Sequence, residues 1–149
     1  MRIAVGSDHA GYELKNQLVQ YLQHLGNEVH DMGTFNKESV DYPDYALLVG
    51  QTINREQAEM GILICYTGIG MSMAANKIKG IRAALVSSVE NAKLTREHND
   101  ANVLCLGAKD TPYETAVAIV DTFLQTKFTE GRHLRRVCKV MQIEKNEKK

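Results

Sequence analysis

The stretch that decides the fold is residues 61–70, Gly61-Ile62-Leu63-Ile64-Cys65-Tyr66-Thr67-Gly68-Ile69-Gly70. Its first half is a continuous apolar run, which is typical of a strand buried on both faces of a parallel sheet. Its second half is a glycine-rich turn that leads into a helix of small residues through Ala74 and Ala75. A buried strand followed directly by a helix is the repeating unit of α/β folds, so this stretch sets the expectation for the whole chain.

The same alternation recurs on either side of that stretch. Short apolar runs at residues 2–6, 28–32, 82–86 and 103–107 predict four more strands. Helical periodicity predicts helices over 11–24, from Pro43 to about 53, over 90–98, from Pro112 to about 124, and from Gly131 onward. The charged tail, 144–149, is expected to be frayed in solvent. We therefore predict a single three-layer α/β/α, Rossmann-like domain over residues 1–149, with a parallel sheet of about five strands and an extra C-terminal helix.

Composition and charge exclude several classes of protein. Apolar residues make up 44% of the chain and charged residues 24%, which is the balance of a globular domain and not of a disordered chain. Eighteen basic and eighteen acidic residues give a formal net charge of zero, which argues against nucleic acid and against an anionic membrane surface as partners. No apolar run approaches the ~20 residues of a membrane span, and the first residues are too polar for a signal peptide. Three widely spaced cysteines exclude a disulfide framework, so we expect a cytoplasmic protein.

Cys65 is the first candidate for chemistry, because ligands bind beside the carboxyl ends of strands in sheets of this kind. The free backbone N–H groups of the turn after it favour a thiolate and can hold an oxyanion or a phosphate. A small buried cysteine without a function fits this position equally well. The turn is not a Cys-x5-Arg phosphatase loop, since Met71 stands at the arginine position, and it lacks the dinucleotide-binding and P-loop patterns.

Three further polar segments are candidates, and each also has a purely structural interpretation. Asp8 and His9 follow the first strand, where they also fit a helix cap. Residues 97–102, Glu-His-Asn-Asp-Ala-Asn, also fit a solvated turn. Arg132 and Arg136 are four residues apart on one helical face, which suits either a phosphate dianion or a solvated basic surface. His9, His98 and the acidic residues near them lack zinc-ligand spacing such as His-Glu-x-x-His, so we expect no metal site.

Seven segments taken in order carry a resemblance to a known family: Gly6-Ser7-Asp8-His9-Ala10-Gly11, Asp41-Tyr42-Pro43, Gly61-Ile62-Leu63-Ile64-Cys65 with Thr67-Gly68-Ile69-Gly70, Ala74-Ala75-Asn76-Lys77, Gly80-Ile81-Arg82-Ala83, Arg96-Glu97-His98-Asn99-Asp100-Ala101-Asn102 and Gly131-Arg132-His133. Together they cover nearly the whole chain. They resemble the type B ribose-5-phosphate isomerases, a family that also holds allose-6-phosphate and galactose-6-phosphate isomerases. Any one of the segments alone is a weak signal, whereas this many in order is specific.

The resemblance implies a cofactor-free aldose–ketose isomerase that interconverts ribose 5-phosphate and ribulose 5-phosphate, in the pentose phosphate pathway, through an enediolate. Cys65 would be the base that moves a proton between C1 and C2, His98 would assist ring opening, and Asp8 would handle the hydroxyl proton. The enediolate would be stabilised by the backbone N–H groups of Tyr66, Thr67, Gly68, Ile69 and Gly70 and by the Thr67 side chain. The phosphate and sugar would be held by His9, Asn99, Lys109, Arg132 and Arg136. The site would be shared between the subunits of a homodimer, alone or within a tetramer.

Two positions depart from the pattern of that family. Members usually carry glycine where Tyr66 stands, and many carry arginine where Lys109 stands. In another branch a glutamate one helical turn after the cysteine position is the base, and this chain has Met71 there. Three alternative functions stay open from the sequence: an isomerase of six-carbon sugar phosphates such as allose 6-phosphate, a cysteine hydrolase using Cys65 and His98, and a non-catalytic sugar-phosphate or nucleotide sensor.

Overall fold

The computed structural model describes residues 1–147 and shows one five-stranded, all-parallel sheet. The strands are β1 (Arg2–Ser7), β2 (Glu28–Asp31), β3 (Met60–Cys65), β4 (Ala83–Leu85) and β5 (Val103–Gly107), in the order β2-β1-β3-β5-β4. The helices are α1 (Tyr12–His24), α2 (Tyr42–Asn54), α3 (Ile69–Ala75), α4 (Val89–Asn99), α5 (Tyr113–Gln125) and α6 (Arg132–Glu147). The predicted three-layer α/β fold with an extra C-terminal helix is confirmed.

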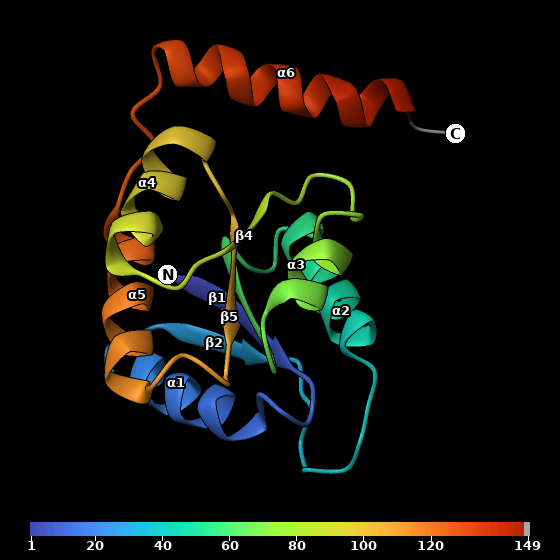
Figure 1. The fold of residues 1–149 in the computed structure, drawn as a ribbon, viewed down its shortest axis with the longest axis vertical. Helices are drawn as coiled ribbons and strands as arrows, with labels where there is room; N and C mark the ends of the chain where they lie inside the picture. The colour runs from blue at the N-terminus through green and yellow to red at the C-terminus, as the bar shows by residue number, and fades with distance from the viewer. Residues whose placement is uncertain (148–149) are drawn as a thin grey trace.

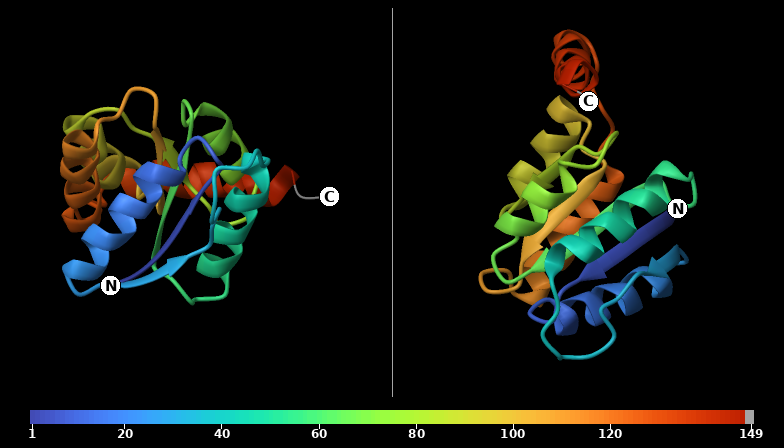
Figure 2. Two further views of the ribbon diagram at one scale, coloured as in Figure 1. Left: turned by 90° about the horizontal axis from the view of Figure 1, so that it is seen from below. Right: turned by 90° about the vertical axis from the view of Figure 1, so that its right-hand side faces the viewer.

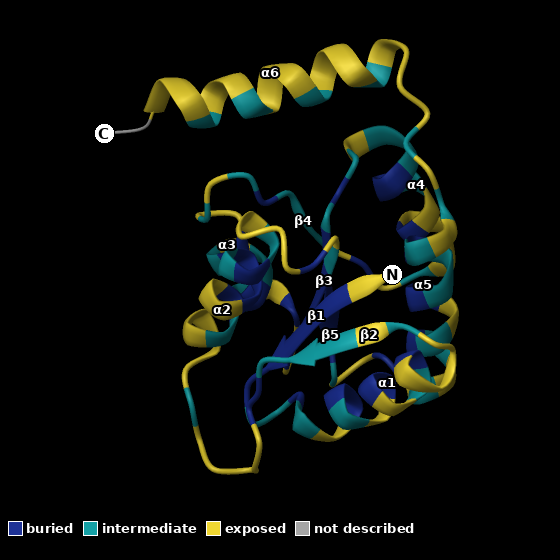
Figure 3. Ribbon diagram, turned by 180° about the vertical axis from the view of Figure 1, so that it is seen from behind, coloured by how far each residue is buried: buried dark blue, intermediate teal, exposed yellow. Residues whose placement is uncertain are grey.

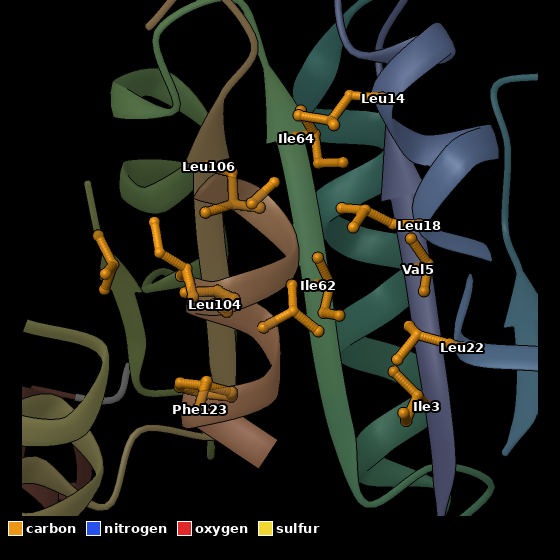
Figure 4. Close-up of a cluster of buried hydrophobic side chains, with 14 of the residues drawn as sticks. Ile3, Val5, Leu14, Leu18, Leu22, Ile62, Ile64, Leu104, Leu106 and Phe123 are labelled. Carbon is orange, nitrogen blue, oxygen red and sulfur yellow. The ribbon is translucent and has the colours of Figure 1, made fainter. Parts of the chain in front are cut away.

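The two faces of the sheet carry separate apolar cores because side chains alternate along each strand. On one face α1, α4 and α5 pack against strand residues such as Ile3, Ile62 and Leu104, as the close-up in Figure 4 shows. On the other face α2 and α3 cover a second core that contains Leu63 and Cys65. Figure 1 shows the two helical layers on opposite sides of the strands. The central strands are buried on both faces, as their apolar runs predict.

Two elements differ most in extent from the sequence-based expectation, whereas the bounds of the others agree with it within about one residue. Strand β4 spans three residues instead of the five predicted over 82–86, although the Val86 N–H still donates to the Cys105 carbonyl at 3.1 Å. Helix α6 continues through Glu147, so residues 144–147 are helical and not a frayed tail. The Glu144 carboxylate accepts hydrogen bonds from the Gly80 N–H, and Gln142 bonds Asn146 one turn later. The remainder of the predicted tail, 148–149, lies outside the described residues.

Helix α6 stands apart from the sheet. It packs against α4 and none of its residues is buried, which Figure 3 shows as a helix without dark blue segments. In the right-hand view of Figure 2 it lies at one end of the molecule, beyond the two helical layers. Leu134, Val140 and Ile143 on this helix are exposed by 45–64% of their surface. None of the helices within residues 1–147 has the length and apolar character needed to cross a membrane.

Candidate active site

The predicted site residues lie in two groups. The Cys65 group consists of Asp8, His9, Cys65, the loop 66–70 and Lys109, which follow the carboxyl ends of β1, β3 and β5. The His98 group consists of His98, Asn99, Arg132 and Arg136, on α4 and α6. The helices of an α/β fold run antiparallel to the strands. The C-terminal end of α4 therefore lies on the side of the sheet where the strands begin (the amino edge), opposite to the side where the strands end (the carboxyl edge). There Arg82, next to the start of β4, donates from Nε to the Asn99 carbonyl at 3.2 Å. The two groups are therefore at opposite edges of one chain.

The Cys65 group lies at the topological switch point between β1 and β3, where the strand order reverses. From β1 the chain moves to β2 on one side, and it then returns to β3 on the other side. Ligands of open α/β sheets bind at such a position, outside the carboxyl ends of the two central strands. Ser7 pairs with Ile64 in the sheet, and the next residue, Asp8, donates its N–H to the Ile64 carbonyl at 3.2 Å. Asp8 and Cys65 are thus brought to neighbouring positions at this edge.

Cys65 is held with its sulfur next to a backbone donor. Its side chain lies on the α2/α3 face and is 5% exposed, and its Sγ accepts a hydrogen bond from the Gly68 N–H at 3.2 Å. This geometry needs glycine at position 68: its φ is 80°, and a Cβ there would lie 2.9 Å from the carbonyl carbon of Leu106. The Gly68 amide is thus held where it donates directly to the Cys65 sulfur.

The loop 66–70 is ordered by contacts of its own. The Ile69 N–H donates to Thr67 Oγ1 at 3.2 Å, and the ring of Tyr42 lies so close to Gly70 that a Cβ there would be 2.5 Å from it. Two of the five predicted anion-binding N–H groups are therefore already engaged, that of Gly68 with Cys65 and that of Ile69 with Thr67. The role of this loop in holding an oxyanion stays a prediction.

Asp8 and His9 form the turn that enters α1. Asp8 is 6% exposed, and its Oδ1 accepts hydrogen bonds from the N–H groups of Ala10 at 3.0 Å and Gly11 at 3.1 Å. The carboxylate thus caps the turn that precedes α1, whereas the N-cap residue of the helix itself is Gly11 and not Asp8. The Nδ1 atom of His9 accepts a hydrogen bond from the Val40 N–H at 3.2 Å. Chemistry by either side chain stays a prediction.

Tyr66 and Lys109 lie side by side at the rim of the Cys65 group. The Lys109 N–H donates to the Tyr66 carbonyl at 2.9 Å, and its Nζ lies 5.9 Å from the centre of the Tyr66 ring. That distance is within the range of a cation–π contact. Tyr66 is 57% exposed, so its ring forms part of the surface of the group and not of the core.

The other two cysteines belong to neither group. Cys105 is buried in β5, where burial raises the pKa of its thiol well above the ordinary range and the nearby Cys65 raises it further. A thiol in that environment does not ionise in neutral solution. Cys138 is exposed on α6. Cys65 is therefore the cysteine that stands at the carboxyl ends of the strands.

In the His98 group the imidazole rings of His98 and His133 are stacked, with centroids 4.1 Å apart and planes 13° apart. Desolvation lowers the pKa of His133 from its ordinary value, and His98 and the neighbouring Arg132 and Arg136 lower it further. His98, Asn99 and Arg136 line one pocket between α4, β4 and α6. Sequence reasoning assigned no role to His133. The only signal for it was its place in the Gly131-Arg132-His133 segment.

The end of α4 is clamped by two arginines, another feature that the sequence did not reveal. Asp100 has a left-handed backbone with φ of 47°. Its Oδ1 lies 2.9 Å from Arg96 Nη1, and its Oδ2 lies 3.3 Å from Arg82 Nη2. Both arginines also donate to backbone carbonyls at this point, Arg96 to Ala101 and Arg82 to Asp100. The clamp fixes the backbone that presents His98 and Asn99.

Within residues 1–147 no cluster of three or more His, Cys, Asp or Glu side chains is arranged to hold a metal ion. The acidic and imidazole groups near Cys65 are engaged instead with backbone N–H groups, as described above for Asp8 and His9.

Comparison with known proteins decides the family. The model of the family described as Ribose/Galactose Isomerase matches residues 3–140. The chain belongs to this family. A putative sugar phosphate isomerase of Rickettsia bellii is 51% identical over 138 residues, which are 93% of this chain and 96% of the relative. The enzyme activity is therefore that of an isomerase.

Solved structures of this family confirm the fold. The ribose-5-phosphate isomerase B of Clostridium thermocellum superposes with a TM-score of 0.98 at 47% identity, over 99% of this chain and 100% of that one. The ribose-5-phosphate isomerase B of Mycoplasma genitalium, solved with bound ribulose-5-phosphate, superposes with a TM-score of 0.91 at 42% identity, over 97% of this chain and 96% of that one. The match to the family thus covers the strands and helices that carry both groups.

Proposed function

We propose that this isomerase interconverts ribose 5-phosphate and ribulose 5-phosphate, without a cofactor, in the pentose phosphate pathway of the cytoplasm. The observation that carries the proposal is the placement of the Cys65 sulfur, 3.2 Å from the Gly68 N–H and beside Asp8 at the topological switch point of the sheet. The solved relative with bound ribulose-5-phosphate supports the choice of sugar. An aldose–ketose shift needs a base on carbon, an anion-stabilising loop and an acid/base group for oxygen protons, and residues of these kinds are present.

The proposed reaction starts from the closed sugar. His98 transfers a proton to the ring oxygen while Asp8 takes the proton of the C1 hydroxyl, and the ring opens to the aldehyde; proton exchange with water then restores both groups. The Cys65 thiolate removes the proton from C2, and the resulting enediolate oxygen is stabilised by N–H groups of the loop 66–70 and by Thr67. Asp8 moves the proton between the two oxygens. The Cys65 thiol then returns its proton to C1, which gives the ketose and regenerates the thiolate.

The phosphate provides binding energy far from the reacting carbons. We assign its binding to His9, Lys109, Arg132 and Arg136, and the contact with the sugar to Asn99. A dianion held by His9 together with the cationic side chains of Lys109, Arg132 and Arg136 orients C1 and C2 over the base, so that binding energy is used in the transition state. Arg136→Ala should therefore raise the KM for ribose 5-phosphate more than it changes turnover of a small sugar without phosphate.

The proposed site needs two chains. Five residues of strand at ~3.3 Å each separate the two edges of the sheet by about 16 Å, which exceeds the reach of one five-carbon sugar phosphate. A second copy that brings its His98 group to the Cys65 group completes the site. The exposed apolar residues of α6 support such an association, because a helix with no buried residue gains stability from a partner. We propose a homodimer, alone or within a tetramer.

The same separation rules out a Cys65–His98 pair for acyl transfer within one chain, and the family match favours isomerisation for the pair formed across two chains. A Cys–His pair for acyl transfer needs the two side chains within hydrogen-bond reach, about 2.6–3.2 Å. Cys65 and His98 lie at opposite edges of one chain. The second candidate that an observation favours is a six-carbon sugar phosphate as substrate, because the matching family is described as Ribose/Galactose Isomerase.

The first test is conversion of ribose 5-phosphate by the purified protein with chelator present, beside Cys65→Ser and beside Cys138→Ser as the matched control. We expect turnover by the wild type and by Cys138→Ser, and none by Cys65→Ser. Loss of activity in the control would contradict the assignment of the base. A folded wild type that converts allose 6-phosphate but not ribose 5-phosphate would replace the proposed substrate by the six-carbon one. One that converts neither would favour the sensor.

Subunit mixing tests the shared site. Cys65→Ala and Arg132→Ala are each expected to be inactive, because every site of the homodimer has one defective half. After random exchange half of the dimers are mixed, and each mixed dimer has one intact site, so about a quarter of the wild-type activity should return. No recovery after mass spectrometry has verified exchange would show that each site lies within one chain.

A further inference from the structure

The loop between β2 and α2, residues 32–41, is fastened to the end of β1 directly before Asp8. The Ser7 N–H donates to the Gly33 carbonyl at 2.7 Å, and the Thr34 N–H donates to the Ser7 carbonyl at 2.9 Å. The loop then runs outward through solvent and returns at Val40, which contacts the side chain of His9. Both ends of the loop are therefore attached to the segment that carries Asp8 and His9.

An ion pair between a fully buried lysine and a half-buried aspartate holds the first end of this loop. Lys15, on the first turns of α1, is fully buried, and its Nζ lies 2.8 Å and 2.9 Å from the two carboxylate oxygens of Asp31. Asp31 Oδ1 also accepts the Gly33 N–H at 3.0 Å. The ring of Phe35 lies 5.5 Å from the Lys15 Nζ, which places a loop residue over the ammonium group. A charge removed from water needs such partners, so the pair fixes where the loop begins.

A third contact fastens the middle of the loop to the same helix. Lys37 of the loop forms an ion pair with Glu13 of α1. The hydrogen bond with Glu13 raises the pKa of Lys37 and lowers the pKa of Glu13, so both groups are charged in neutral solution. Both side chains are exposed, and their contribution to stability is accordingly small. The contact guides the loop back toward its return point at Val40.

The contact at the return point selects one form of His9. A backbone N–H can only donate, so a nitrogen that accepts from it must carry a lone pair and no proton. The Val40 N–H donates to His9 Nδ1 at 3.2 Å. The imidazole that satisfies this bond is the neutral tautomer with its proton on Nε2. Among residues 1–147 Nε2 has no hydrogen-bond partner, so this N–H is free to donate to a ligand oxygen.

We propose that the loop 32–41 is a positioning device that fixes His9 as the Nε2–H tautomer through the Val40 N–H, so that His9 holds the substrate phosphate as a neutral donor and not as a cation. Val40 is the positioning residue, and the Lys15–Asp31 ion pair fixes the start of the loop that carries it. The inference rests on the proposed function for the identity of the ligand, whereas the tautomer itself does not depend on any activity.

The first experiment reads the tautomer directly. In ¹⁵N-labelled wild-type protein at pH 8, the ring nitrogens of His9 should show a protonated Nε2 and an unprotonated Nδ1, before and after addition of inorganic phosphate. The signals of His9 are assigned as those that are missing from the spectrum of the His9→Gln variant. A protonated Nδ1, alone or in an imidazolium, would overturn the proposal. A wild type without isomerase activity that still shows the Nε2–H tautomer would count against the proposed function and not against this inference.

A second experiment removes the donor. Val40→Pro has no N–H, whereas Val40→Ala keeps it and is the matched control. We expect the KM for ribose 5-phosphate to rise roughly tenfold in Val40→Pro and to stay near the wild-type value in Val40→Ala, with kcat changed less than KM. Equal KM values in the two variants would overturn the role of the N–H.

Substitution of His9 itself gives a third measurement that does not depend on how the loop tolerates proline. The amide nitrogen of glutamine reaches the place of Nε2, and that of asparagine reaches the place of Nδ1. His9→Gln should therefore bind inorganic phosphate more tightly than His9→Asn, as measured by calorimetric titration. The reverse order, or equal weak binding by both, would show that the position needs a cation or a donor at Nδ1.

Discussion

Replacing Gly68 by alanine is the perturbation for which the structure gives the most definite expectation. The φ of Gly68 is 80°, and its N–H donates to Cys65 Sγ. A methyl group on this residue would lie 2.5 Å from Leu85 Cδ1 and 2.9 Å from the carbonyl carbon of Leu106. The Leu85 side chain can rotate away, but the backbone of the central strand β5 cannot. The loop 66–70 must therefore shift and carry the amide away from the sulfur.

The magnitude follows from two contributions. A left-handed backbone costs a residue with a Cβ roughly 1–2 kcal/mol, and forcing extra atoms into a packed site costs about 1–3 kcal/mol. We therefore expect Gly68→Ala to lower the free energy of unfolding by roughly 2–5 kcal/mol. Gly26→Ala is the matched control, because Gly26 has φ of 91° and a Cβ added there would have no other atom within 4 Å. It should lose only about 1–2 kcal/mol.

Urea unfolding of both variants at the same protein concentration measures this difference, since association of subunits would otherwise shift the midpoint. Loss of a hydrogen bond to a charged group is worth about 1.5–3 kcal/mol, so kcat of Gly68→Ala should fall roughly 10- to 100-fold while Gly26→Ala stays at the wild-type rate. Equal losses of stability in the two variants would refute the argument that a methyl group on residue 68 collides with the backbone of β5. A wild-type kcat in Gly68→Ala would refute the link between this amide and the thiolate.

Three other predictions concern residues outside the loop 66–70. Lys15→Met leaves the Asp31 carboxylate without its buried partner and should lower the free energy of unfolding by about 3 kcal/mol, read from urea unfolding. Cys105 should resist iodoacetamide at pH 8 in the folded protein and react once the chain is denatured, because burial raises its pKa; mass spectrometry locates the label. NMR titration should give His133 a pKa below the ordinary value of about 6.5, moving back toward it in His98→Asn. A depressed pKa means that the unfolded chain takes up this proton first, so the contribution of His133 to stability should decline as the pH falls below about 6.5.

The fold followed from sequence because its determinants are local. The run 61–65 is apolar at every position, which only a strand covered on both faces accommodates, and helical periods fill the spaces between such runs. Element ends were less accessible to sequence reasoning. Helix α6 passes its predicted end because the Glu144 carboxylate accepts the distant Gly80 N–H, a contact between residues far apart in the chain.

The contacts of the candidate site also differ in whether the sequence could predict them. The contact of Cys65 with Gly68 spans three residues, and the glycine pattern after the strand indicates it. By contrast, the stack of His98 on His133 joins helices separated by β5 and α5, and no spacing in the sequence encodes it. The bond from Val40 to His9 likewise depends on how the loop 32–41 returns. Contacts of this kind require the three-dimensional path of the chain.

The parallel topology explains why one chain separates its two groups of functional residues. Residues that follow strands gather at the carboxyl edge, and residues that end helices gather at the amino edge, so Cys65 and His98 cannot meet within a single sheet of this order. Because the proposed reaction uses both residues, we propose that they come from two copies of the chain, with the carboxyl ends of one sheet facing the amino ends of the other. The long helix α6 carries Arg132 and Arg136. Among the larger contacts between helices within residues 1–147, α6 contacts only α4. In the proposed homodimer, the uncovered apolar residues of α6 and the divided site are two consequences of the same arrangement, in which association would create the active site as well as the interface.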